Sequence, residues 1–276
     1  MGRAGIEPAT LGLMETEGRT PAILAAAQAP SPRLSSEAMV DGDINVSVAT
    51  LTSDYVAKTI DHSLLSPELD AAAVLDGCDL ACCYSVASVC AKPSDVAAVA
   101  EALRGSGVKV GTVIGFPHGS SKTEIKVYEA EWAVAEGAEE LDLVLNIARL
   151  RAGASSDVRS DIQAVCEVAS GRALVKVILE SAYLDEDQKV LGCRLAESAG
   201  ASFVSASTGF APMGTKAEDV RLIRRTLSPG TQVKAAGGVD SLDSLLGMLR
   251  AGAIRIGTSA TETILEEFKA REARWE

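Results

Sequence analysis

Two short motifs hold the residues of this chain that are best suited to chemistry. Lys234 lies in the run VKAAGG, and Ser205 lies in the run FVSASTGF. An amine at the end of a short apolar strand, beside a glycine pair whose amides suit a phosphate group, has what carbonyl chemistry on a sugar phosphate requires. The motifs therefore raise the question of which elements position such an amine.

From Leu51 onward, short β-prone runs alternate with alanine-rich helical stretches. Strands are predicted at 59–63, 87–91, 108–115, 141–146, 174–180, 202–207, 232–236 and 254–258, and helices include 121–136, 158–169, 186–199 and 241–251. Strands that alternate with helices imply a parallel sheet, and eight such units match a closed (β/α)8 barrel, the TIM-barrel class of α/β fold. A doubly wound open sheet is the alternative, but the glycine-rich loop that usually follows its first strand is missing after 59–63.

Alternation along these strands assigns several charged residues to the barrel interior. In LDLVLN, Asp142 lies on the strand face opposite the leucines, which pack against helices, so its side chain points into the barrel. The same alternation places Lys176, Lys234 and Asp61 inward. Buried charges are usually paired, so one interpretation is a salt-bridge network of Asp142 with Lys234 or Lys176 that only stabilises the barrel. Because four charges converge on the mouth where barrels carry their active sites, we favour a functional site.

Glycines follow the last two predicted strands. Gly237 and Gly238 follow the seventh strand, and Gly257 with Ser259 ends the eighth. Barrels often bind phosphate at this place through backbone amides, although glycines also serve simple turns. The glycines thus add a phosphate site to the predicted amine.

Composition restricts the class of protein. The chain has 276 residues, 47% of them hydrophobic, and a net charge of -12, which disfavours nucleic acid and anionic membranes as partners. Its six cysteines follow no disulfide or metal spacing, which indicates a reducing compartment, and no apolar run approaches a membrane span. The two histidines, His62 and His118, do not form a metal-ligand pattern, so we expect no metal site. We expect His62 to form a hydrogen bond with the backbone at the barrel rim.

Residues 1–50 differ from the rest of the chain because prolines interrupt a stretch rich in Ala, Gly and Ser. We predict a disordered or non-native extension over 1–50 and a single barrel domain over 51–276.

Eight runs, in order over about residues 53–262, closely resemble deoxyribose-phosphate aldolases. They are IDHSLL (60–65), ASVCAKP (87–93), VKVGTVIGFPHG (108–119), GAEELDLVLNIARL (137–150), KVILE (176–180), ASTGF (206–210), VKAAGGV (233–239) and AGAIRIGTS (251–259). The resemblance implies a (β/α)8 fold, a cytoplasmic enzyme without metal or organic cofactor, and reversible cleavage of 2-deoxy-D-ribose 5-phosphate to glyceraldehyde 3-phosphate and acetaldehyde. It also implies a homodimer or higher homo-oligomer.

The resemblance also implies roles for individual residues. In the family a lysine on the sixth strand forms a Schiff base with the substrate, and Ser205 occupies that position here. Lys234 matches a second lysine that lowers the pKa of the nucleophile, and Asp142 and Thr208 match the proton relay. The matches to the phosphate-binding loops are Gly209, Gly237, Gly238, Gly257 and Ser259, and those near the pocket are Asp61 and Cys90.

Three hypotheses follow from Ser205. The first is an aldolase in which Lys234 or Lys176 supplies the Schiff-base amine. The second is a catalytically impaired binder of sugar phosphates. The third is a related lyase or isomerase in which Asp142 and Lys234 act as acid and base without an imine.

Overall fold

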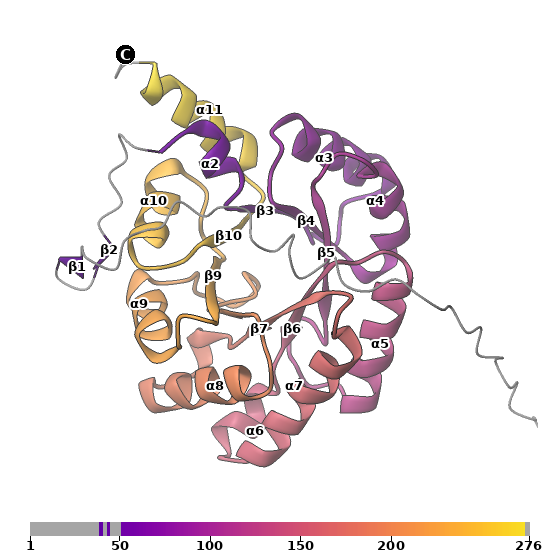
Figure 1. The fold of residues 1–276 in the computed structure, drawn as a ribbon, viewed down its shortest axis with the longest axis vertical. Coiled ribbons are helices and arrows are strands. Elements are labelled where there is room, and N and C mark those ends of the chain that lie inside the picture. The colour runs from indigo at the N-terminus through magenta and orange to yellow at the C-terminus, as the bar shows by residue number, and fades with distance from the viewer. Residues whose placement is uncertain (1–38, 41–42, 45–50, 274–276) are drawn as a thin grey trace, which may run out of the picture. The chain divides into compact units, whose positions relative to one another are not determined.

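The computed structural model describes residues 39–40, 43–44 and 51–273 (Figure 1). The predicted extension, residues 1–50, lies outside the described residues except for two short strands. These strands, β1 (Met39–Val40) and β2 (Asp43–Ile44), pair antiparallel.

Eight parallel strands form a closed barrel, in which the last strand pairs with the first. The strands are β3 (Ile60–Leu64), β4 (Ser88–Ala91), β5 (Lys109–Ile114), β6 (Glu140–Val144), β7 (Leu174–Ile178), β8 (Phe203–Ser205), β9 (Gln232–Ala236) and β10 (Arg255–Thr258). The predicted (β/α)8 barrel is confirmed, and the open-sheet alternative is wrong because β10 hydrogen-bonds to β3.

Helices follow the strands and surround them (Figure 1). They are α2 (Ser53–Ala57), α3 (Ala71–Cys83), α4 (Val96–Ala102), α5 (Thr123–Ala135), α6 (Ile147–Arg151), α7 (Ser155–Ala169), α8 (Glu186–Ser198), α9 (Ala217–Thr226), α10 (Leu242–Arg250) and α11 (Thr261–Glu272), with 3₁₀ turns η2 (Pro93–Asp95) and η3 (Ser181–Tyr183). Asp185 begins α8 and Ser241 begins α10 through capping boxes, which satisfy the first amides of each helix. Within the described ranges, none of these helices has both the length and the apolar content that a membrane crossing needs.

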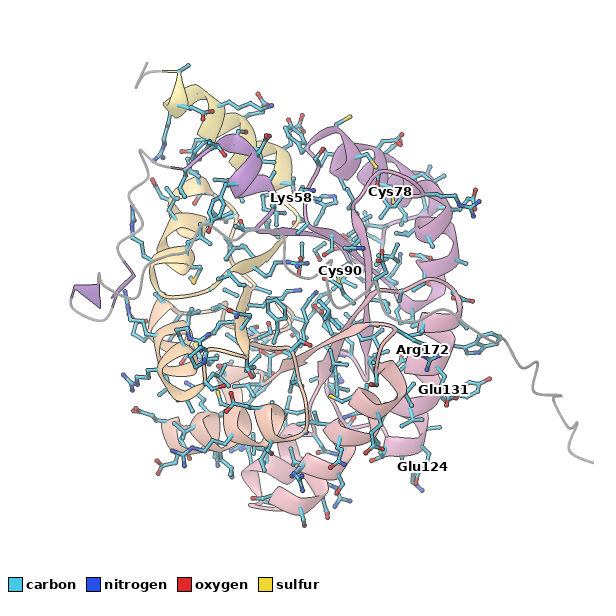
Figure 2. The ribbon with its side chains drawn as sticks, viewed as in Figure 1. Lys58, Cys78, Cys90, Glu124, Glu131 and Arg172 are labelled. Atoms are coloured by element: carbon cyan, nitrogen blue, oxygen red, sulfur yellow. The ribbon has the colours of Figure 1, made fainter. Side chains whose placement is uncertain are left out.

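The hydrophobic core lies between the strands and the helices. Leu141, Leu143, Val177 and Val204 are fully buried there, and each such side chain contributes about 1.5–3 kcal/mol by leaving water. Side chains alternate along a strand, so the residues between these leucines and valines point into the barrel. Figure 2 shows Cys90 within the ring of strands, whereas Glu124 and Glu131 of α5 lie on its outside.

His62 lies on the outward face of β3. Its Nδ1 is 2.9 Å from the hydroxyl of Thr261 in α11, and burial lowers the pKa of the imidazole to about 4. The expectation that His62 bonds backbone at the rim was wrong. Because Asp61 points inward, its neighbour His62 must face the helix layer.

Candidate active site

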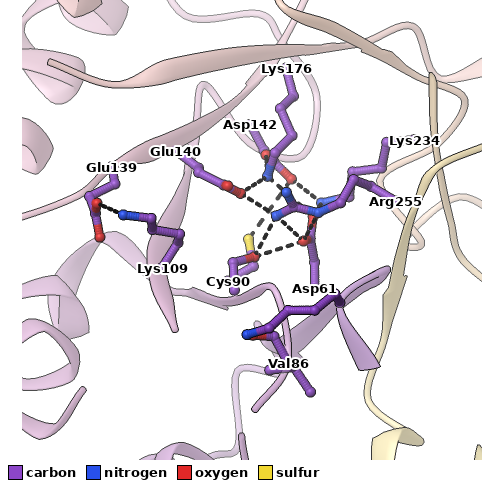
Figure 3. A network of polar contacts seen from close by, with 12 residues as sticks. Asp61, Val86, Cys90, Lys109, Glu139, Glu140, Asp142, Lys176, Lys234 and Arg255 are labelled. Carbon is purple, nitrogen blue, oxygen red and sulfur yellow. Dashed lines mark hydrogen bonds and ion pairs between the residues drawn. The ribbon is translucent and has the colours of Figure 1, made fainter. Parts of the chain in front are cut away.

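Six charged side chains meet inside the barrel (Figure 3). They come from five strands and are Asp61 on β3, Glu140 and Asp142 on β6, Lys176 on β7, Lys234 on β9 and Arg255 on β10. Strand register brings them together, since Asp142 is the partner of Lys176 and Lys234 is the partner of Arg255. The structure thus brings together the four charges that the alternation rule had placed inside, and it adds Glu140 and Arg255.

Each cation in this cluster contacts at least two carboxylates. Lys176 Nζ lies 2.6 Å from Glu140, 3.0 Å from Asp142 and 3.2 Å from Asp61. Lys234 Nζ lies 2.5 Å from Asp142 Oδ2 and 2.8 Å from Asp61 Oδ2. Arg255 contacts Asp61 at 2.5 Å and Glu140 at 2.6 Å. Three positive charges therefore balance three negative charges.

The charge balance keeps every group in the cluster ionised. Burial alone would raise the pKa of Asp61, but Arg255, Lys176 and Lys234 hold that pKa well below its ordinary value. Burial would lower the pKa of Lys176, but Asp142, Asp61 and Glu140 raise it well above the ordinary value. The pKa of Lys234 is likewise raised, chiefly by Asp142 and Asp61 against the effect of burial.

A pocket of about 360 Å³ opens at the carboxyl ends of the strands. Lys234, Asp142, Asp61 and Cys90 line it, and Lys234 is the one lysine among its described lining residues. Lys176 is fully buried and does not line this pocket. Of the two lysines proposed as Schiff-base amines, only Lys234 is placed where a ligand can reach it.

Ser205 is also fully buried and lies outside the pocket lining. It pairs in register with Lys234, and its hydroxyl oxygen has no hydrogen-bond partner among the described residues. A short side chain at this position therefore stops below the surface that a substrate would touch.

The predicted phosphate residues line one side of the pocket: Gly209, Gly237, Gly238, Gly257 and Ser259. Gly237 has a φ of 88°, and a Cβ there would lie 2.8 Å from the Cα of Gly209, so the two loops approach too closely for a side chain. The amide of Gly209 donates to Ser207 Oγ at 3.0 Å. This leaves the Gly237–Gly238 turn and Ser259 as the better candidates for contact with a phosphate group.

Thr208 and Cys90 line the pocket with their polar atoms already engaged. The Thr208 hydroxyl donates to Glu180 and accepts from the amide of Phe210 at 3.0 Å. Cys90 Sγ lies 3.9 Å from Asp142, and burial followed by the charge of Asp142 raises the pKa of the thiol to about 12. Cys90 is therefore a neutral thiol beside the carboxylate.

Sequence reasoning missed Glu140, Arg255 and Glu180. The first two were detectable, because Glu140 stands two residues before Asp142 and Arg255 two residues before Gly257, on the same inward faces. Glu180 has a left-handed backbone just after β7, and no local sequence pattern predicts that conformation. Within residues 51–273, no group of three or more His, Cys, Asp or Glu side chains is arranged to hold a metal ion.

Comparison with known proteins gives a consistent family. The model of the DeoC/LacD family aldolases matches residues 55–262. Curated relatives include a deoxyribose-phosphate aldolase of Geobacillus sp. (strain WCH70), 47% identical over 76% of this chain and 95% of the relative, and one of Clostridium perfringens (strain ATCC 13124), 46% identical over 78% and 96%.

Solved structures agree with the sequence relatives. A putative deoxyribose-phosphate aldolase from Coccidioides immitis superposes with a TM-score of 0.78 at 36% identity and covers 90% of this chain and 95% of its own. The tetrameric deoxyribose phosphate aldolase from Aeropyrum pernix gives a TM-score of 0.75 at 31% identity, over 80% of this chain and 93% of its own.

Proposed function

Because this chain belongs to the DeoC/LacD family of aldolases, we propose that it is a carbon–carbon lyase that cleaves 2-deoxy-D-ribose 5-phosphate to glyceraldehyde 3-phosphate and acetaldehyde. One observation carries the proposal: the amine of Lys234 lies in a pocket beside the Gly237–Gly238 turn, 2.5 Å from the carboxylate of Asp142. A reactive amine, a proton acceptor and a phosphate cradle are then within one cavity.

Lys234 would supply the amine in this mechanism. Asp142 accepts a proton from the ammonium group, and the neutral amine adds to the C1 aldehyde of the open-chain sugar. Asp142 returns the proton to the resulting hydroxyl group, water leaves, and a protonated imine remains.

The imine then accepts the electrons of the broken bond. Asp142 takes the proton of the C3 hydroxyl, the C2–C3 bond breaks, and its electron pair forms an enamine on Lys234 while glyceraldehyde 3-phosphate departs. Protonation of C2 and hydrolysis release acetaldehyde and restore the amine. Lys176 and Arg255 balance the carboxylates throughout and do not reach the substrate.

Neither Ser205 nor Lys176 can replace Lys234 in this role. The hydroxyl of Ser205 cannot form a protonated imine, and it lies outside the pocket. Lys176 is fully buried and does not line the pocket, so the substrate carbonyl does not reach its amine.

A second candidate function is a sugar-phosphate binder that does not break the carbon–carbon bond. The raised pKa of Lys234 favours it, since a Schiff-base lysine must lose its proton before it attacks. Under this alternative the pocket holds its ligand, and Lys234 remains an ion-pair partner of Asp142.

Borohydride trapping distinguishes these functions. The protein is incubated with 2-deoxyribose 5-phosphate and borohydride, digested, and analysed by mass spectrometry beside Lys234→Arg, which keeps the charge but cannot form the imine. We expect an adduct on Lys234 together with release of glyceraldehyde 3-phosphate, and neither in the variant.

Other outcomes assign the remaining hypotheses. Turnover that resists borohydride would indicate acid–base chemistry by Asp142 and Lys234 without an imine. Ligand binding without turnover or adduct would establish a sugar-phosphate-binding protein that does not cleave its ligand.

The proposal includes the setting expected for such an enzyme. We expect it to act in the cytoplasm, without a cofactor, and as a homodimer or larger homo-oligomer. The relative from Aeropyrum pernix is itself tetrameric. Light scattering at several protein concentrations measures the assembly.

A further inference from the structure

Glu180 combines strained backbone with a buried carboxylate that contacts Thr208, a residue of the pocket lining. Its φ of 57° and ψ of 66° lie in the left-handed region, which only Ser85 shares among the described non-glycine residues. The residue is 2% exposed and does not line the pocket. Such a conformation is unfavourable for a residue with a Cβ and persists where surrounding contacts enforce it.

The contacts of Glu180 reach the loop that follows β8. Its Oε2 accepts from the amide of Thr208 at 3.2 Å and from the Thr208 hydroxyl. The adjacent amide of Ser181 donates to the carbonyl of Ala206 at 2.8 Å. The end of β7 therefore holds the beginning of the β8–α9 loop through both side chain and backbone.

The same chain of contacts continues to the mouth of the pocket. The Thr208 hydroxyl accepts from the amide of Phe210, and the rings of Phe210 and Phe116 pack in a T-shape with centroids 5.1 Å apart. Thr208, Phe210 and Phe116 all line the pocket. Glu180 thus connects, through Thr208, to a wall made by loops from β8 and β5.

We propose that Glu180 is a positioning residue that fixes the Thr208–Phe210 loop in the shape the pocket ligand requires. The inference rests on the proposed function, because it takes a phosphorylated sugar as the ligand of this pocket. The proposal also gives Thr208 a role other than membership of the predicted proton relay. Since its hydroxyl proton is donated to the Glu180 carboxylate, Thr208 acts as the link that transmits the position of Glu180 to the loop.

Two variants and one control test the proposal. Glu180→Gly removes both the anchor and the backbone strain, and Glu180→Gln keeps an acceptor oxygen without the charge. Ser85→Gly is the matched control, because it relieves the other left-handed residue on an exposed turn outside the pocket. Hydrogen exchange of a peptide over residues 206–212 reports on the loop.

Affinity is measured with 2-deoxyribitol 5-phosphate, the reduced sugar phosphate, which cannot form an imine or be cleaved. In Glu180→Gly we expect exchange of the loop to rise and the Kd to rise by about tenfold or more, the effect of one hydrogen bond to a charged group. Glu180→Gln should fall between this variant and the parent, and Ser85→Gly should change neither quantity.

Two results would overturn the inference: loop exchange in Glu180→Gly that matches the parent, or a loosened loop with a Kd within about twofold of the parent. A parent that does not bind the reduced sugar phosphate contradicts the proposed function instead. The exchange measurement needs no ligand, so the two failures are distinguishable.

Discussion

Ser205 and Lys234 are partners in the register of β8 and β9, so a lysine at 205 would place a second amine beside the first. The cluster already has equal numbers of cations and carboxylates, and a fourth cation would lower the pKa of both amines by like-charge repulsion. We expect Ser205→Lys to raise kcat/KM at neutral pH by at least about tenfold, since one pKa unit changes the neutral fraction of an amine by that factor.

The pH profile of kcat/KM checks this expectation. Its acid limb should move to lower pH in Ser205→Lys, while Ser205→Met, of similar length but without an amine, should resemble the parent. Equal activity of the lysine and methionine variants would contradict the argument.

Individual residues differed in how well the sequence predicted them. Alternation placed Asp142, Lys176 and Lys234 inside the barrel. Their apolar neighbours pack against the helices, so the charged residue between them points to the opposite face of the strand, the barrel interior. Alternation could not show that Lys176 stays below the pocket while Lys234 enters it, since both positions follow the same alternation. That difference depends on how far each residue lies along its strand and on which carboxylates surround it.

At the scale of elements, Lys126 of α5 connects three segments. Its fully buried Nζ lies 2.6 Å from Asp161 of α7 and 2.9 Å from the carbonyl of Val144 at the end of β6. Burial lowers the pKa of Lys126, and Asp161 opposes that effect. Lys126→Met would leave Asp161 as a buried carboxylate without its cation, and we expect a loss of about 3–5 kcal/mol in the free energy of unfolding.

Urea titration measures this loss. The control is Lys109→Met, which breaks the half-exposed pair with Glu139 and should change the free energy of unfolding by no more than about 1 kcal/mol. Similar values for the two variants would show that burial of the Lys126 pair has no special effect.

The elements themselves were largely predictable from the sequence. All eight strands were expected, because short apolar runs between helical stretches leave little choice of pairing in a barrel. The sixth barrel strand was predicted to reach residue 207, yet the corresponding strand, β8, ends at Ser205. The hydroxyls of Ser207 and Thr208 each accept an amide two residues further on and turn the chain, which apolar periodicity does not reveal.

At the scale of the whole molecule, stability should depend on pH in two acid stages. The pKa of His62 is lowered from 6.5 to about 4 in the folded state, so the unfolded state binds the proton more readily and stability falls as pH drops from 6.5 to 4. This stage amounts to roughly 3 kcal/mol. Asp61, Glu140 and Asp142 have lowered pKa values, so they stabilise the fold above their ordinary range and lose that effect at still lower pH.

At alkaline pH the free energy of unfolding falls as pH rises, the opposite of its dependence in acid. Lys176 and Lys234 have pKa values raised above 10.5, so their contribution is complete below that pH and is lost as pH rises through the folded values. Chemical denaturation at a series of pH values should give a plateau between about 7 and 9, because the raised pKa of the Cys90 thiol makes stability fall once pH passes the ordinary thiol value of 9.0. His62→Asn should remove the decline between 6.5 and 4 and keep the steeper loss below it; a decline that persists in the variant would exclude His62 as its source.

The charge cluster also sets when the site can first exist during synthesis. Asp61 on the first barrel strand meets Arg255 on the last, and 194 residues separate them in the chain. A ribosome that has made the chain as far as β9 therefore holds a protein whose Asp61 and Glu140 lack their guanidinium partner. Only a chain that includes β10 can close the barrel and neutralise them, so the site is assembled after translation has passed residue 255, and any product that stops earlier is without it.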